Sequence, residues 1–254
     1  MIKADIKIPT SWSELTDTQA AQIISVVHLA KGLSKEEALL ICALRTSGIK
    51  MISTDSSGAL LLIPKAYTST RSTIMSRIPY QRLTQLISAI SWVLDMPDIP
   101  WRPKKLMLAR PVDPRLNDLT FGQFLEADAL YSAHITAPDY LKLRRLARIL
   151  VPHALRHPAQ WEQHAIIMWF SSLKTWLSHR YPNLYTRSAI DGSGGTLAPS
   201  RQSFQAQFDA LLRALTKGDP LKEDAVLGLP LHRALTELDA LAAETEKIRS
   251  LSRK

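Results

Sequence analysis

The stretch LTFGQFLEAD, residues 119–128, carries the clearest helix-start signal in this 254-residue chain. Thr120 suits the N-cap position and Gln123 the third helical position, so the two residues can exchange hydrogen bonds as a capping box. Leu119 and Phe124 stand where a hydrophobic staple packs across the first turn. The spacing therefore predicts a helix that begins here and docks on a core through one apolar face.

The same helix-start signal recurs near the N-terminus. Thr16 is followed by Gln19, and Ser34 by Glu37, each pair ahead of a run with apolar residues at helical spacing. These pairs predict two short helices joined by a turn. Gly122 lies in the first turn of the helix predicted to begin at Thr120, but neither the capping box nor the hydrophobic staple requires it.

One segment departs from the helical pattern. The runs IKMIS and ALLLIP flank the turn-forming TDSSG, which predicts a β-hairpin over residues 49–63. Apolar residues return to helical spacing from about residue 80 to 94, which predicts a helix there. The last predicted helix runs from about residue 230 to 249. The predicted fold class is therefore all-α in the main, a multi-helix bundle with one small β-hairpin near residues 49–63.

Proline and glycine predict how the chain is divided. Residues 97–118 contain five prolines, and repeated loss of the backbone N–H excludes a continuous helix or a central strand. This segment is predicted to connect an N-terminal helical lobe, residues 1–96, to a C-terminal helical lobe, residues 119–254. The glycine-rich DGSGGTLAPS lacks the spacing of a nucleotide-binding loop, so a flexible loop is expected near 191–199.

The formal net charge of +9 favours acidic partners, nucleic acid among them. A nucleic-acid interface would draw on the connector and on one side of the helix in LKLRRLARIL. Its residues would be Trp101, Arg102, Lys104, Lys105, Lys142, Arg145 and Arg148. The alternatives are that the helix presents an ordinary solvated face and that Trp101 anchors the connector by packing.

Catalytic and metal-binding patterns are not evident in the sequence. The single cysteine, Cys42, lies in an apolar run and is predicted to be a core residue. His153 and His157 have metal-ligand spacing, but the prolines beside them oppose a helix through both. We therefore predict no enzyme activity, cofactor or metal, and because no window approaches the length of a membrane span, a cytoplasmic protein.

Four stretches, spread over most of the chain, carry a family resemblance: IPTSWSELTDTQ (8–19), LTFGQFLEAD (119–128), WF…LKTWLSHRYPNLY (169–185) and GDPLKEDAVLGLPLHRALTELDALAAE (218–244). Through them the chain resembles a family of helical proteins from tailed phages and prophages of gut Bacteroidales. Proteins of this kind occur among tail morphogenesis genes. The resemblance implies a tail assembly chaperone, which coats the apolar, helical tape measure protein in the bacterial host cell until tail tube subunits polymerise around it.

The last predicted helix is the candidate surface for such a partner. Its apolar seam consists of Leu231, Leu235, Leu238 and Leu241. The alternative is that this seam packs on the core of the protein itself. Two other functions stay open beside the chaperone: a nucleic-acid-binding protein, and a structural connector or completion protein that remains in the virion. Self-association is a further option.

Overall fold

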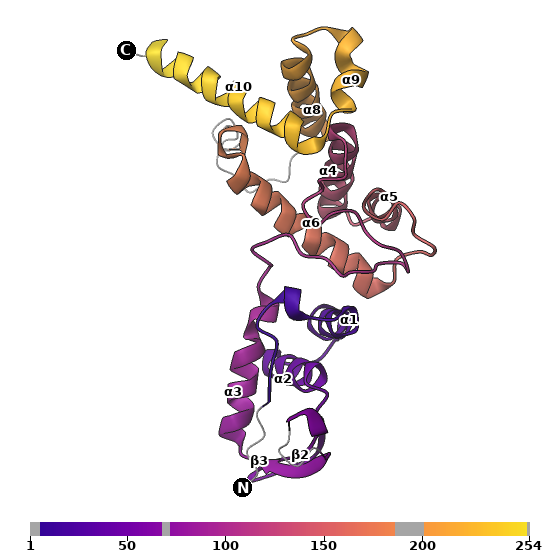
Figure 1. The fold of residues 1–254 in the computed structure, drawn as a ribbon, viewed down its shortest axis with the longest axis vertical. Coiled ribbons are helices and arrows are strands. Elements are labelled where there is room, and N and C mark those ends of the chain that lie inside the picture. Colours follow the sequence, from indigo (N-terminus) through magenta and orange to yellow (C-terminus); the bar gives the residue numbers. More distant parts are fainter. Residues whose placement is uncertain (1–5, 68–71, 186–200, 253–254) are drawn as a thin grey trace. The chain divides into compact units, whose positions relative to one another are not determined.

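The computed structural model describes residues 6–67, 72–185 and 201–252 (Figure 1). The chain divides into two compact units, Met1–Pro97 and Asp98–Lys254. Both units are mainly helical, as predicted, and strands occur within the first. The predicted loop near 191–199 lies outside the described residues.

The first unit combines helices with a small sheet. Its α-helices are α1 (Asp17–Ile24), α2 (Lys35–Thr46) and α3 (Tyr80–Ile90), and its strands are β1 (Lys50–Asp55), β2 (Gly58–Ile63) and β3 (Ile74–Ile78). A π-helical turn, Ser25–Leu29, continues α1, and short 3-10 segments cover Trp12–Glu14, Lys65–Tyr67 and Ser91–Leu94. The predicted helix over 80–94 is thus α3 followed by a tighter last turn.

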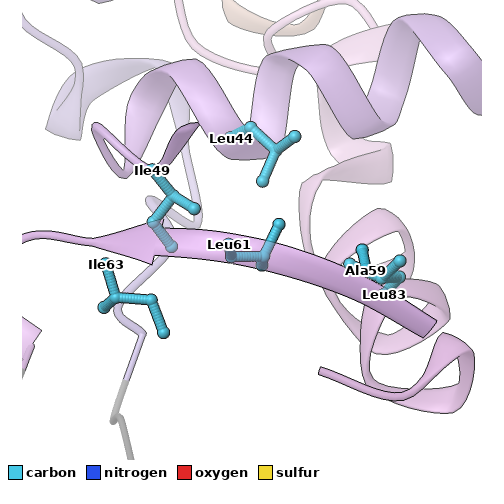
Figure 2. Close-up of a cluster of buried hydrophobic side chains, with 6 residues drawn as sticks. All are labelled: Leu44, Ile49, Ala59, Leu61, Ile63 and Leu83. Atoms are coloured by element: carbon cyan, nitrogen blue, oxygen red, sulfur yellow. The ribbon is translucent and has the colours of Figure 1, made fainter. Parts of the chain in front are cut away.

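The sheet is antiparallel in the order β1-β2-β3. The predicted hairpin is confirmed as β1 and β2, with Asp55 opposite Gly58 at the turn, and β3 adds a strand that the sequence analysis left unassigned. Alternate residues of β2 are fully buried and pack with residues of α2 and α3 in one cluster (Figure 2). The cluster consists of Leu44, Ile49, Ala59, Leu61, Ile63 and Leu83. Burial of this single face fixes the register, because a slip by one residue would turn these side chains to solvent.

Gly58 follows the hairpin turn, and its missing side chain allows the start of β2 to lie close to the end of β3. It has φ +148°, and a Cβ there would lie 2.2 Å from the carbonyl oxygen of Ile78. Gly58→Ala is expected to destabilise the first unit by about 2 kcal/mol through strain and overpacking. Hydrogen exchange of the β2 amides should accelerate accordingly. Gly32→Ala is the control, since Gly32 has φ +83° but open space around it; equal acceleration in both variants would contradict the steric account.

The second unit contains helices only, apart from isolated bridges, in its described residues. They are α4 (Phe121–Thr136), α5 (Tyr140–Leu150), α6 (Gln160–Arg180), α8 (Arg201–Thr216), α9 (Glu223–Leu227) and α10 (Leu231–Ser252), with a 3-10 turn at Pro220–Lys222. Helices α4 and α5 are the helix pair with the most extensive mutual packing, and α10 packs on α4 and α8. Phe121 of α4, Leu146 of α5, and Trp169 and Phe170 of α6 are all essentially buried.

All three predicted capping boxes are confirmed. In the central one, the backbone N–H of Thr120 donates to Gln123 Oε1 over 3.0 Å, and the backbone N–H of Gln123 donates to Thr120 Oγ1 over 3.3 Å. The Thr16–Gln19 and Ser34–Glu37 pairs form the same reciprocal bonds. Local sequence therefore fixed where α1, α2 and α4 begin.

The proline-rich segment belongs to the second unit from residue 98 onwards. Leu106, Met107 and Leu116 within it are fully or almost fully buried. The indole N–H of Trp169 in α6 donates to the carbonyl oxygen of Pro114 over 2.8 Å. Residues 98–118 thus form neither a helix nor a named strand, as their prolines predict, but they are not extended: the segment turns repeatedly, with positive φ at Met107, Leu108 and Leu116, and it is packed within the second unit.

Candidate functional site

A cavity of about 250 Å³ lies in the second unit, beside α5 and the turn that follows it. Its wall is unusually basic. The lining residues are Met107, Arg144, Arg148, Pro152, Ala154, Leu155, Arg156, His157 and Pro158. We call this cavity the arginine pocket. It has room for several water molecules or for one small polar ligand.

Two of the arginines come from the same face of α5. Arg144 and Arg148 are four residues apart, so their side chains are neighbours on the helix surface. Within the described residues, neither side chain forms an ion pair with a carboxylate. The Nε of Arg144 is buried and has no hydrogen-bond partner there. Arg144 therefore has one donor without an acceptor, and neither guanidinium is neutralised by a carboxylate within the described residues.

The third arginine is held in place by a buried carboxylate. Arg156 Nη1 and Nη2 donate to the two carboxylate oxygens of Glu162 over 2.6 and 2.8 Å, and the Glu162 side chain is 2% exposed. Glu162 also accepts the backbone N–H groups of Met107, over 2.7 Å, and Ala159, over 2.8 Å. This carboxylate thus joins the start of α6, the turn that carries Arg156 and the proline-rich segment at one wall of the pocket.

The α5 residues predicted for nucleic-acid binding do not act together. Arg148 lines the arginine pocket. Arg145 instead pairs with Glu126 over 3.1 Å, and Lys142 lies 4.0 Å from Asp139. The predicted strip is therefore partly neutralised by acidic neighbours.

The predicted residues of the connector are placed differently from those of α5. Arg102 donates to the carbonyl oxygen of Val112 over 2.6 Å, and its guanidinium lies 5.8 Å from the Trp169 ring centroid. Trp101 is half-buried, which suits the packing alternative, whereas Lys104 and Lys105 are exposed. None of these four residues lines the arginine pocket.

The sequence did not predict that Arg144, Arg156 and His157 line one cavity. The spacing of Arg144 and Arg148 is a visible signal, because residues four apart share a helix face. Arg156 and His157 join them through the irregular turn after α5, and no local pattern predicts its path. No prediction was made for Glu162, whose buried carboxylate accepts a hydrogen bond from the proline-rich segment at Met107.

The predicted seam of α10 lies largely in the core of the second unit. Leu231, Leu235 and Leu238 are 0, 2 and 3% exposed. They are not available to a partner in this structure, which corresponds to the alternative that the seam packs on the protein itself. Leu241 is 36% exposed, and its neighbour Ala242 is the buried residue of that turn.

The apolar residues that α10 does expose lie further along the helix. Ile248 is 65% exposed and Leu251 72% exposed. Leu241, Ile248 and Leu251 are spaced by seven and three residues, which places them along one side of the helix. We call these three residues the distal stripe. In Figure 1 this part of α10 (yellow) extends past α8 and α9 of the same unit.

The remaining candidates contribute no catalytic geometry. Burial raises the pKa of the Cys42 thiol to about 11, which leaves it a poor nucleophile near neutral pH. The described residues contain no group of three or more His, Cys, Asp or Glu side chains placed to hold a metal ion. Over the same residues, no helix has the length and apolarity to cross a membrane.

Comparison of the chain with protein-family models, with curated proteins and with solved structures found no match.

Proposed function

We propose that this chain is a non-enzymatic assembly protein that binds a helical protein partner, and specifically a phage tail assembly chaperone for the tape measure protein. The observation that carries the proposal is the distal stripe of α10. Large apolar side chains exposed on one side of a helix suit a helix-in-groove or helix-on-helix contact. The phage assignment comes from the sequence resemblance, and the binding mode comes from this surface.

The chemistry of the stripe indicates the kind of partner. A tape measure protein presents long apolar helical stripes before the tail tube surrounds it. Leu241, Ile248 and Leu251 would contact such a stripe, and Glu244, which is exposed on the same side of the helix, would keep its carboxylate in water at the edge of that contact. A stripe of only three residues gives a modest apolar contact, which is appropriate for a chaperone that must later release its partner.

The distal stripe can be tested without disturbing the core. Ile248→Glu with Leu251→Glu is expected to weaken capture of the co-expressed tape measure protein by at least about tenfold, because two charges would enter an apolar contact. The measurement is co-purification from nuclease-treated lysate, followed by titration of the purified partner. Deletion of Leu231 to Lys254 is a poorer test, because it would remove buried residues.

Leu221→Glu is the matched control. Leu221 is 92% exposed and lies outside α10, so the same apolar-to-acidic change there should leave capture unchanged. Normal capture by the Ile248→Glu, Leu251→Glu variant would contradict the proposal. Retention of the protein in purified particles would instead favour a structural virion component, since a chaperone leaves before the particle is complete.

A further inference from the structure

We propose that the arginine pocket is a binding site for a compact oxyanion of the phosphate class, either as inorganic phosphate or as the phosphate group of a small metabolite. The inference concerns a different surface from the distal stripe and does not depend on the proposed chaperone function. It rests on the cavity, on the three arginines that line it and on a buried donor that has no partner within the described residues.

The charges around the cavity are unbalanced. Arg144, Arg148 and Arg156 all line it, and Glu162, bound to Arg156, is the one carboxylate paired with any of them among the described residues. Like charges four residues apart on a helix repel each other, so Arg144 and Arg148 destabilise α5 unless something compensates. A bound anion would supply that compensation.

The donors also lack acceptors. Arg144 Nε is buried without a hydrogen-bond partner in the described residues, and an unsatisfied buried donor is costly. A turn of the Arg144 guanidinium toward the cavity would let a phosphate oxygen accept this bond. Arginine suits the task because its planar guanidinium presents paired N–H donors that match phosphate oxygens.

The pocket is better suited to a small ligand than to a nucleic-acid strand. A strand needs cations distributed along its backbone, yet Arg145 and Lys142 on α5 face acidic partners. Arg144 and Arg148, which form no ion pair within the described residues, instead line one concavity. Its volume of about 250 Å³ suits one phosphate with residual water or with a small organic group attached.

Glu162 acts here as a positioning residue. By binding both nitrogens at the end of Arg156, it orients that guanidinium at the wall of the cavity. His157 is the next residue, so an imidazole stands beside the three arginines in the lining. The sequence Arg156-His157-Pro158 thus contributes two potential donors from one turn.

The test is isothermal titration calorimetry of the full chain at constant ionic strength, with inorganic phosphate in one arm and a nucleoside 5′-monophosphate in the other. Binding in the first arm identifies phosphate itself as sufficient; binding only in the second identifies a phosphorylated metabolite. Arg144→Gln with Arg148→Gln is expected to reduce affinity at least about a hundredfold, because each arginine contributes charged hydrogen bonds.

Arg145→Gln is the matched control, since it removes the same charge from the same helix but from a side chain paired with Glu126. It should bind phosphate like the parent protein. Arg148→Gln alone, at an exposed position, provides a second variant that does not disturb the core, with at least about a tenfold loss expected.

Three results would overturn the proposal. One is the absence of heat in both arms. Another is an equal loss of phosphate affinity in the Arg145→Gln control, which would mean that affinity depends only on the net charge of the protein. The third is binding of a DNA or RNA oligonucleotide that depends on Arg144 and Arg148 when neither small phosphate binds, because the pocket would then be part of a nucleic-acid interface.

Discussion

Glu162→Ala is expected to destabilise the second unit by about 3–4 kcal/mol. The substitution removes both acceptors of the Arg156 guanidinium and leaves the backbone N–H groups of Met107 and Ala159 without their partner. Loss of one partner from a buried, hydrogen-bonded ion pair is among the most destabilising single changes. Urea unfolding followed by far-ultraviolet circular dichroism should show the midpoint of the second unit lowered by roughly 1–2 M.

Two companion variants separate the causes of that loss. Glu162→Gln retains one oxygen acceptor and the side-chain shape, so it should fall between the parent and Glu162→Ala. Glu126→Ala removes the partner of Arg145 from a solvent-exposed pair and should cost less than about 1 kcal/mol. If Glu126→Ala and Glu162→Ala lowered the free energy of unfolding by similar amounts, burial of Glu162 would not make its ion pair more stabilising than an exposed one.

Glu162 also shows where sequence reasoning stops. Its position near the start of α6 is readable from sequence, and its carboxylate does accept the Ala159 N–H as a helix-start residue should. The contact with Met107 joins residues 55 apart. Met107 adopts φ +50° and Leu108 φ +64°, a conformation that ordinary residues seldom take. Neither the left-handed turn nor its carboxylate partner leaves a local pattern.

The predicted helix starts succeeded because a capping box needs only residues three apart. The hairpin of β1 and β2 was predictable for the same reason, since its turn and both strands are adjacent. Strand β3 pairs with β2 across a longer connection. Its five residues, IMSRI, are too few for an alternation of apolar and polar residues to indicate a strand. It is recognised as a strand only through its pairing with β2.

Gly122, in the first turn of α4, also has a role that depends on a contact distant in the sequence. Capping and the hydrophobic staple explain Thr120, Gln123 and Phe124 without it. In the structure, a Cβ at Gly122 would stand 3.2 Å from the Cβ of Leu227. The glycine therefore permits close approach of α9 to α4, a requirement imposed by residues about a hundred positions away.

Trp169→Ala is expected to release the proline-rich segment from the second unit. Trp169 is 1% exposed, its N–H donates to the carbonyl oxygen of Pro114, and Arg102 lies over its ring. Truncation of a buried tryptophan to alanine typically costs about 3–5 kcal/mol. Limited trypsin digestion should report the release, since cleavage after Lys104, Lys105 and Arg115 requires the local backbone to open. An increase of at least about tenfold in cleavage rate is expected.

Two tryptophan-to-phenylalanine variants test whether the hydrogen bond to Pro114 contributes. Trp169→Phe keeps a ring in the core but removes the indole donor, so cleavage should rise by roughly fivefold, as for the loss of about 1 kcal/mol. Trp92→Phe removes an equivalent bond in the first unit, where the Trp92 indole donates to the carbonyl oxygen of Pro9 over 2.9 Å. Because residues 98–118 pack on α6 through Trp169, only the Trp169 variants should expose them; unchanged cleavage in Trp169→Ala would mean that the segment is held independently of this anchor.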